Sequence, residues 1–548
     1  MNYNVASYLQ KIATEQPELV AVKVPVKKSN SLGQYHTLTF AQLNRNANCC
    51  AQGLRNAGVN PGTKVLMMVK PGMEMLAFAF AVFKAGCVPV FLDPGMNLKS
   101  MLSCIHKTQP ECLIGIPQAH ILSLIFKKKF FNIKYRLTAG RSFGWRGETY
   151  SSMIKKYDGN FQDYNAKKDD LAAILFTSGS TGPPKGVCYK HGQFHRQLDL
   201  LKEYFNIKPG GIDFPMLPVF TLFNPALGLQ TVVPQMHPAK PASFDAKLIV
   251  TSIINENITQ SFGSPVLWKK IVDYCEDEKF LLDKLKCILI AGAPVPPKLI
   301  QRLSKIAVNA LIHTPYGATE SLPVSCIESK EIIAETMTMT LEGKGMCVGQ
   351  PLPGLQCKII QECDDIILNI EGVVEYENYK VGEIIVCGDN VTESYDNDEQ
   401  ATRASKINDG NKIWHRIGDL GYQDDKGRLW YCGRKSHCVQ TNIKKYYSVC
   451  CEAVFNEHPM VERSALIEVN KIGESEPAIV VESHNVTSEN AIELHRELLT
   501  IAANFEHTKE ISKFYCKENF PVDVRHNAKI HRIDLKNWAV SQNELEKW

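Results

Sequence analysis

The sequence lacks an apolar run long enough to cross a membrane. Its most apolar stretch, residues 75–92, is interrupted by Lys84, Gly86 and Pro89, whereas a spanning helix needs about 20 apolar residues. Residues 1–18 lack the basic start and apolar run of a secretory signal. The net charge is only +4 over 548 residues, which argues against nucleic acid as a partner. These absences predict a cytoplasmic protein.

Paired metal-binding cysteines are also missing. The 18 cysteines are scattered, and none has the CxxC spacing of a zinc site. A chain of this length does not need disulfides, and free cysteine packs as a small apolar residue. There is no internal repeat and no low-complexity tract. We therefore expect an ordinary globular protein with free thiols in a reducing compartment.

What is present is an alternation of strand-like and helix-like patterns. It predicts an α/β fold of largely parallel, helix-covered sheets, and 548 residues exceed the roughly 250–300 that one core supports. The pattern changes near residue 433. We predict a large N-terminal domain of helix-covered mixed sheets over 1–433, a hinge at 434–436, and a small mobile α+β domain over 437–548.

A glycine- and hydroxyl-rich loop, TSGSTGPPKG at 177–186, follows the apolar run LAAILF. Its glycines let backbone N–H groups approach an anion, and Lys185 offers a point charge for phosphate. It is not a Walker A loop, because prolines precede the lysine and glycine follows it. A surface linker is the alternative interpretation, but the loop lies tightly between two apolar runs. We therefore predict a triphosphate site.

This loop resembles the phosphate loop of the adenylate-forming superfamily, which comprises acyl-CoA synthetases, luciferases and peptide-synthetase adenylation domains. The resemblance covers nearly the whole chain, because further motifs follow in the family's order. Residues 314–320 (TPYGATE) resemble its adenine motif, and residues 291–294 (AGAP) resemble the loop between adenine and the acyl pocket. The resemblance implies ATP and Mg²⁺ as cofactors.

The resemblance also implies a role for each motif residue. Tyr316 lies against the adenine, Thr319 binds the α-phosphate and Glu320 holds magnesium; an aromatic face, a hydroxyl and a carboxylate suit these tasks. Asp419 accepts hydrogen bonds from the ribose, and Arg434 contacts the nucleotide beside the hinge. The expected nucleotide-binding residues are Thr177, Ser178, Gly179, Ser180, Thr181, Gly182, Lys185, Gly292, Ala293, Pro294, Tyr316, Gly317, Ala318, Thr319, Asp419 and Arg434.

A lysine near the C-terminus completes the expected catalytic group. Lys529 matches the last lysine of the family's Pro-Lys-Thr…Gly-Lys segment, where a cation stabilises charge as a carboxylate attacks phosphorus. A surface lysine is the alternative interpretation. The expected catalytic residues are Lys529, Thr319, Glu320 and Lys185, and the metal ligand is Glu320.

One segment departs from the CoA ligases of this superfamily. Residues 440–452 contain no glycine and no proline, although CoA ligases usually carry a glycine here that lets the backbone lie beside the attacking thiol. Delivery of CoA is therefore not expected.

The C-terminal run DVRHNAKIHRIDLKNWA at 523–539 resembles the olefin β-lactone synthetases of bacterial long-chain hydrocarbon biosynthesis. So do residues 217–229, 262–268, 291–297 and 314–324. This resemblance implies that the carboxylate of a 2-alkyl-3-hydroxy fatty acid is adenylated, and that its own hydroxyl then closes a β-lactone. An acyl-CoA ligase, an acyl-AMP ligase serving a carrier protein, and a nucleotide-binding module without catalysis are the alternatives.

Three further expectations follow from the sequence. Apolar residues of 217–230 and 262–268 should line an acyl tunnel, and His526 and His313 are candidate bases by chemistry alone. The mixed basic and aromatic run at 124–131 is interpreted either as a solvated helix end or as a peripheral contact with a membrane or a multi-enzyme assembly.

Overall fold

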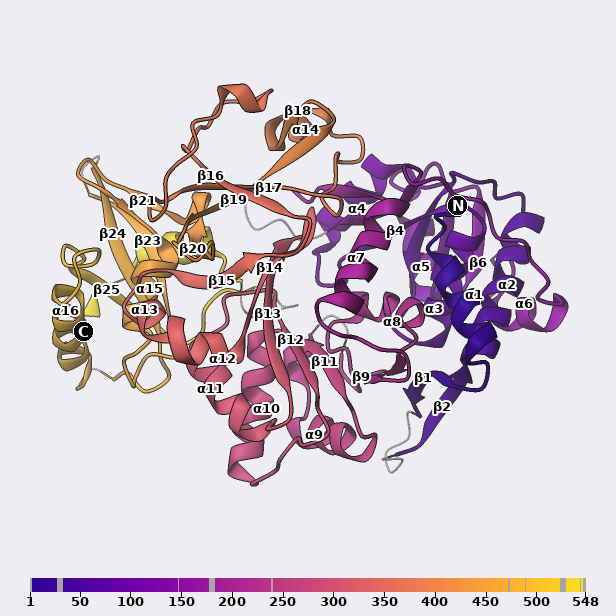
Figure 1. Ribbon diagram of the computed structural model, residues 1–548, viewed down its shortest axis with the longest axis horizontal. Coiled ribbons are helices and arrows are strands. Elements are labelled where there is room, and N and C mark those ends of the chain that lie inside the picture. The colour runs from indigo at the N-terminus through magenta and orange to yellow at the C-terminus, as the bar shows by residue number, and fades with distance from the viewer. Residues whose placement is uncertain are drawn as a thin grey trace.

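Two large sheets and a smaller C-terminal sheet organise the chain (Figure 1). The computed structural model describes residues 2–26, 33–145, 147–176, 183–237, 240–471, 474–487, 489–522, 529–542 and 544–545. The N-terminus lies on one side of the molecule and the C-terminus on the opposite side, with the longest sheet between them. None of the helices in the described ranges has the length and apolarity to span a bilayer.

The six-stranded sheet carries helices on both faces. Its order is β6 (Tyr135–Thr138), β5 (Cys112–Gly115), β3 (Lys64–Met68), β4 (Val88–Leu92), β7 (Leu171–Phe176) and β8 (Gly186–Lys190). In β3, Val65 and Met67 join the core cluster that contains α3, whereas Leu66 joins the cluster that contains α4. This alternation follows from side chains pointing to opposite faces along a strand. The result is a sheet buried on both sides, parallel except for the antiparallel pair of β7 and β8.

The longer sheet has 14 strands. Its order is β16 (Gln356–Ile360), β17 (Gly382–Cys387), β19 (Lys412–Gln423), β20 (Leu429–Arg434), β15 (Met346–Pro351), β14 (Ser321–Glu328), β13 (Leu311–Ala318), β12 (Cys287–Ile290), β11 (Gln260–Gly263), β9 (Ile212–Asp213), β10 (Gln230–Val232), β1 (Val20–Pro25) and β2 (Tyr35–Thr39), with β18 (Lys406–Asp409) beside β19. Strands β9–β13 pair in parallel, but the pairs from β13 to β16 are antiparallel. The expectation of largely parallel sheets is therefore wrong for this half, because short hairpin turns reverse the chain there.

Helices cover these sheets and separate many of their strands. They are α1 (Ala6–Glu15), α2 (Phe40–Asn56), α3 (Met73–Lys84), α4 (Leu98–Thr108), α5 (Pro117–Ile125), α6 (Tyr150–Lys156), α7 (His191–Glu203), α8 (Asn224–Leu227), α9 (Ala246–Asn255), α10 (Pro265–Asp277), α11 (Pro297–Ile306), α12 (Ser329–Glu331), α13 (Met337–Leu341), α14 (Glu399–Ser405), α15 (Ser448–Phe455), α16 (Ala491–Ala503) and α17 (Arg532–Ala539), with a short 3₁₀ helix η1 (Pro218–Leu222). Thr39 and Gln42 form a capping box at the start of α2, as in many helix N-termini. The observed elements confirm the predicted α/β class.

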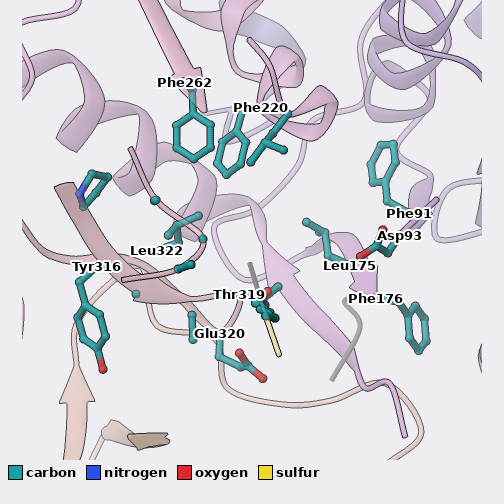
Figure 2. Close-up of a pocket in the computed structure, with 18 of the residues that line it drawn as sticks. Phe91, Asp93, Leu175, Phe176, Phe220, Phe262, Tyr316, Thr319, Glu320 and Leu322 are labelled. Carbon is teal, nitrogen blue, oxygen red and sulfur yellow. The ribbon is translucent and has the colours of Figure 1, made fainter. Parts of the chain in front are cut away.

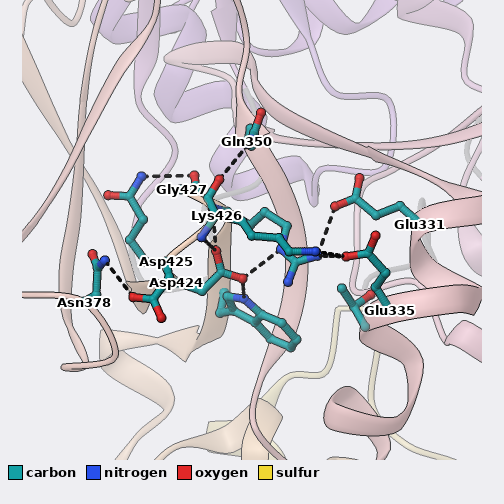
Figure 3. Close-up of polar contacts among 12 residues, drawn as sticks. Glu331, Glu335, Gln350, Asn378, Asp424, Asp425, Lys426 and Gly427 are labelled. Carbon is teal, nitrogen blue, oxygen red and sulfur yellow. Dashed lines mark hydrogen bonds and ion pairs between the residues drawn. The ribbon is translucent and has the colours of Figure 1, made fainter.

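A polar network fixes the hairpin between β19 and β20 (Figure 3). The Asp424 carboxylate accepts hydrogen bonds from the backbone N–H of Lys426 at 3.0 Å and of Arg428 at 2.9 Å. It also accepts from the Trp430 indole at 2.9 Å, while the Arg428 guanidinium reaches Glu335 at 2.8 Å. The turn at 424–427 is therefore held tightly, and it sets the register of both strands.

The chain after residue 436 has its own small sheet and core. A short hairpin of β21 (Val439–Gln440) and β22 (Lys445–Tyr446) precedes a three-stranded sheet of β23 (Arg463–Lys471), β24 (Glu474–Glu482) and β25 (Lys513–Lys517). One face of this sheet packs with α15 and α16, and the other face packs with α17. The α+β character predicted for this region is present; the domain boundary stays a prediction.

Candidate active site

One cavity of about 2390 Å³ lies among the two large sheets and the C-terminal part. Every described residue of the expected site lines it, which brings together segments more than 300 residues apart in sequence. These residues are Lys185, Gly292, Ala293, Pro294, Tyr316, Gly317, Ala318, Thr319, Glu320, Asp419, Arg434 and Lys529. Figure 2 shows Tyr316, Thr319 and Glu320 on the polar side of this cavity.

Thr319 and Glu320 form the two-residue connection between β13 and β14. Ala318 pairs with Ser321 across the hairpin, so the two side chains stand where the strands end. Gly317 precedes them, and a Cβ on this residue would lie 2.5 Å from the Ser321 carbonyl oxygen. Glycine is therefore required for this turn, because no other residue permits so close an approach of the backbone.

Three residues outside the motif hold Glu320 in place. The Tyr395 hydroxyl donates to Glu320 Oε1 at 2.6 Å, and the Thr392 backbone N–H donates to the Glu320 carbonyl oxygen at 2.8 Å. The buried Lys406 ammonium donates to the Thr392 carbonyl oxygen. Burial is the main cause that lowers the pKa of Lys406 to about 7, and Glu320 and Glu393 oppose it. The carboxylate is thus oriented before any ligand binds.

Asp419 and Arg434 face each other across β19 and β20. The register pairs these two residues directly, which explains their fixed spacing in the sequence. Tyr316 donates its hydroxyl proton to Asp419 Oδ2 at 2.6 Å. Burial raises the pKa of Asp419, and Arg434 is the strongest influence in the opposite direction. Strand pairing therefore builds this part of the site.

The second oxygen of Asp419 fits the hydroxyl groups of a ribose. Arg434 Nε lies 3.0 Å from Asp419 Oδ1 as an ion pair, yet among the described residues no hydrogen-bond donor points at this buried oxygen. A buried acceptor without a donor is costly, so a ligand hydroxyl would be a favourable partner. Tyr316 and the Gly292–Pro294 loop line the cavity as an adenine base would require.

Lys185 lies where the expected phosphate loop enters β8. Its ammonium sits 5.0 Å from the centre of the Tyr395 ring, and the hydroxyl of this tyrosine donates to Glu320. Thr177, Ser178, Gly179, Ser180, Thr181 and Gly182 lie outside the described residues, and their role stays a prediction. Glu320 and nearby phosphate oxygens would supply the hard oxygen ligands that Mg²⁺ prefers.

The C-terminal part contributes Lys529, His437 and Arg532 to the cavity. The positive charge of Lys529 lowers the pKa of Asp419 and so opposes the larger upward shift that burial causes. Burial, followed by Arg532 and Arg434, lowers the pKa of His437 to about 3, so its imidazole stays neutral at ordinary pH. His437 follows the predicted hinge directly, and its place in the cavity was not expected from the sequence.

The expected acyl lining is only partly correct. From 217–230, the residues Leu217, Phe220, Thr221, Leu222, Phe223 and Ala226 line the cavity. From 262–268, only Phe262 does so, whereas Trp268 is fully buried in the core beside it. The expectation for Leu267 and Trp268 is wrong because both project from α10 into the core rather than toward the cavity.

Of the two histidines named as candidate bases, His313 lies away from the cavity. His313 packs its ring against Phe205 at 5.2 Å and does not line the cavity, because it points from β13 toward α7 and the residues that follow it. His526 lies outside the described residues. The sequence analysis did not identify Tyr395 and Lys406, because no short motif marks them. Folding of distant segments brings Tyr395 to Glu320 and Lys406 to Thr392.

Comparison with known proteins gives the same assignment for nearly the whole chain. The profile of AMP-binding enzymes matches residues 9–396. The olefin β-lactone synthetase of Xanthomonas campestris is 39% identical, covering 98% of each chain, and that of Stenotrophomonas maltophilia is 38% identical, covering 99% of each. The O-succinylbenzoate coenzyme A synthetase of Bacillus subtilis, solved with ATP and magnesium ion, shares the fold with a TM-score of 0.74 and 22% identity over 96% of this chain and 99% of that one.

A single cavity that brings together Lys185, Glu320 and Asp419 from distant parts of the chain agrees with this profile. The protein therefore belongs to the AMP-binding enzyme family, and it is an adenylate-forming synthetase that uses ATP to activate a small carboxylate substrate.

Proposed function

We propose that this enzyme converts a 2-alkyl-3-hydroxy fatty acid into a β-lactone in two steps. The first step joins the carboxylate to AMP and releases pyrophosphate. In the second, the 3-hydroxyl attacks the acyl carbon of the same molecule and expels AMP. The similarity to two olefin β-lactone synthetases over almost the full length supports this proposal.

The observation that carries the proposal is the segment that replaces the CoA ligases' glycine. Residues 440 and 445 form the β21–β22 hairpin and line the cavity with side chains rather than bare backbone. Lys445 also forms an ion pair with Glu362, so two charged side chains stand where a pantetheine arm would have to pass. A tethered hydroxyl needs no such channel and has the rate advantage of an intramolecular nucleophile.

In the first step we assign the roles as follows. Lys185 and the loop 177–182 hold the β- and γ-phosphates, Asp419 accepts from the ribose, and Tyr316 contacts the adenine. Glu320 would hold Mg²⁺, which neutralises phosphate charge when it is bound. Thr319 and Lys529 donate to the α-phosphate and the carboxylate, where negative charge develops.

In the second step we propose that the C-terminal part turns about Lys435 and withdraws Lys529. The Lys435 ammonium now lies 2.6 Å from Asp364 Oδ1, so the turn must break this contact. The 3-hydroxyl then loses its proton, its oxygen bonds to the acyl carbon, and the bond from that carbon to the AMP oxygen breaks.

Product analysis tests the proposal. The enzyme is incubated with MgATP and a 2-alkyl-3-hydroxy acid, with and without CoA, and the products are identified by mass spectrometry. We expect lactone and AMP without CoA. Thioester that forms only when CoA is added, with no lactone, would instead establish an acyl-CoA ligase. Nucleotide binding without acid-dependent pyrophosphate release would establish a protein that has lost catalysis.

We also propose a peripheral contact with an anionic lipid surface through α5 and the residues after it. Ile125 and Phe131 are 67% and 56% exposed, and Ile121 and Leu124 are exposed beside them. Lys127 and Lys128 are exposed within the same patch, and no acid among the described residues forms an ion pair with them. Apolar anchors flanked by unpaired lysines are typical of surfaces that bind anionic lipid.

Vesicle flotation tests this contact. We expect the full-length enzyme to float with vesicles containing anionic lipid and not with zwitterionic vesicles, and Ile125→Asp to abolish flotation. Lys536→Glu, on α17 outside the patch, is the charge control. Equal flotation of Ile125→Asp and the unsubstituted enzyme would exclude this surface, and leave the run at 124–131 as a solvated helix end.

A further inference from the structure

The apolar lining of the cavity falls into two sets. The first, which we call the phenylalanine arm, consists of Met216, Phe220, Met236 and Phe262, from η1, β11 and the segments beside them. The second, the strand-end arm, consists of Met68, Met101, Leu122 and Phe176, at the carboxyl ends of β3 and β7 and on α4 and α5. In Figure 2, Phe220 and Phe262 lie together, apart from Phe176.

The two arms are built by different parts of the fold. The phenylalanine arm belongs to the long sheet, and its Phe220 and Phe262 rings stack with centroids 3.8 Å apart. The strand-end arm belongs to the six-stranded sheet, where Met68, Met101 and Leu122 are half-buried at the edge of a core cluster that contains Phe176. Thr319 and Glu320 line the same cavity as both sets. Both arms thus open into the space that holds the reacting carboxylate.

The lining of the cavity indicates that both arms receive apolar groups. The cavity volume of about 2390 Å³ contains the expected nucleotide residues as well as both arms, so the two arms are the apolar parts of one larger site. Half-buried methionine, leucine and phenylalanine side chains that face an interior cavity remain in contact with water until a ligand covers them. Covering them with hydrocarbon is favourable in proportion to the area removed from water.

We infer that the two alkyl chains of a 2-alkyl-3-hydroxy acid occupy separate arms, one in the phenylalanine arm and the other in the strand-end arm. This inference rests on the proposed function. The chains diverge at the second carbon, next to the carboxylate, so a bound acid presents them in two directions from the point where adenylation occurs. Separate arms hold that carbon in one orientation and keep the 3-hydroxyl near the acyl carbon.

Substitutions that fill one arm test the inference. Leu122→Trp narrows the strand-end arm, and Met236→Trp narrows the phenylalanine arm. Acid-dependent pyrophosphate release is measured for two series of acids, one lengthened only in the 2-alkyl branch and one only in the chain beyond the third carbon. The readout is the ratio of kcat/KM for long and short members of a series, which does not depend on the fraction of folded enzyme.

We expect each variant to discriminate against length in one series only, and the two variants to act on different series. One buried methylene is worth about a fourfold change in an equilibrium constant, so excluding two lowers the long-to-short ratio by more than about tenfold. Leu122→Ala should shift the preference of the same series toward longer chains. Leu281→Trp, which adds the same bulk at an exposed leucine outside the cavity lining, is the matched control and should leave both ratios unchanged.

Two results would overturn the inference. Either Leu122→Trp leaves both ratios unchanged, or Leu122→Trp and Met236→Trp act on the same series, which would place both chains in one arm. Failure of the proposed function gives a different result: the unsubstituted enzyme would release no pyrophosphate with any of these acids, or would release it without forming lactone.

Discussion

The nucleotide site has two sides of different construction. On one side, Tyr316, Asp419 and Arg434 lie on paired strands, and hydrogen bonds between backbones fix their register. On the other, Lys529 belongs to the part of the chain after residue 436. That part meets the rest partly through ion pairs of long side chains, such as Lys445 with Glu362 and Glu457 with Lys298.

This difference matches the two steps of the proposed reaction. Groups that hold AMP are needed in both steps, and they are placed on strands that cannot shift without breaking a sheet. In the proposed reaction Lys529 is needed only while the carboxylate attacks phosphorus. The ion pairs that join its part of the chain to the rest cost little free energy to break in water. The comparison predicts that substitutions on the two sides affect different steps.

The largest effect is expected from Lys529→Ala. Loss of a cation at the developing charge should lower the rate of acid-dependent pyrophosphate release by about 100- to 1,000-fold. Lactone formation from supplied acyl-AMP should change little, because the lysine has withdrawn by then. Lys536→Ala, whose lysine pairs with Glu468 on β23, is the control; an equal loss in that variant would mean that Lys529 acts only through stability.

Asp419→Asn should weaken binding of the nucleotide on the strand-built side of the site, and so affect both steps. It removes a charged acceptor for the ribose, and hydrogen bonds to charged groups are worth enough to raise the KM for ATP by about 10- to 100-fold. The measurement is pyrophosphate release as a function of ATP concentration. Asp425→Asn, an exposed residue on the same hairpin turn, should leave this KM unchanged. An unchanged KM for Asp419→Asn would remove Asp419 from the nucleotide site.

Tyr395→Phe should weaken the binding of Mg²⁺ rather than the binding of the nucleotide. Without the hydroxyl that bonds Glu320 Oε1, the carboxylate is free to rotate, and we expect the Mg²⁺ concentration for half-maximal activity to rise about tenfold. The titration is repeated with Tyr379→Phe, whose hydroxyl bonds the exposed Asp425 at 2.9 Å. The assignment of Glu320 as metal ligand is weakened if both variants respond to Mg²⁺ as the unsubstituted enzyme does.

The smallest effect is expected from Glu362→Gln. This change weakens one ion pair between the two sides, and such a pair is worth at most about 1 kcal/mol, so rates should change by less than about fivefold. The direction of the change is informative. Lactone closure should become faster relative to adenylation, because the C-terminal part turns away from the rest of the protein more easily. Glu375→Gln, whose partner Lys358 lies on the far edge strand β16, controls for the loss of one charge. A slower closure step would argue against the proposed rotation.

The sequence alone determined the local parts of this protein. The apolar strand before the phosphate loop and the turn at 424–427 depend only on residues that are neighbours in the chain. Turn chemistry and the alternation of apolar residues are sufficient for such features, because the atoms that decide them are close in the chain.

Only the tertiary structure decided which distant groups support the active site. Tyr395 reaches Glu320 from 75 residues away, and Lys406 is buried behind it although nothing in its local sequence predicts a buried lysine. The wrong position expected for Trp268 and the division of the cavity into two arms have the same origin. Such features depend on how two sheets pack against each other, and packing is set by contacts among side chains that no short stretch of sequence contains.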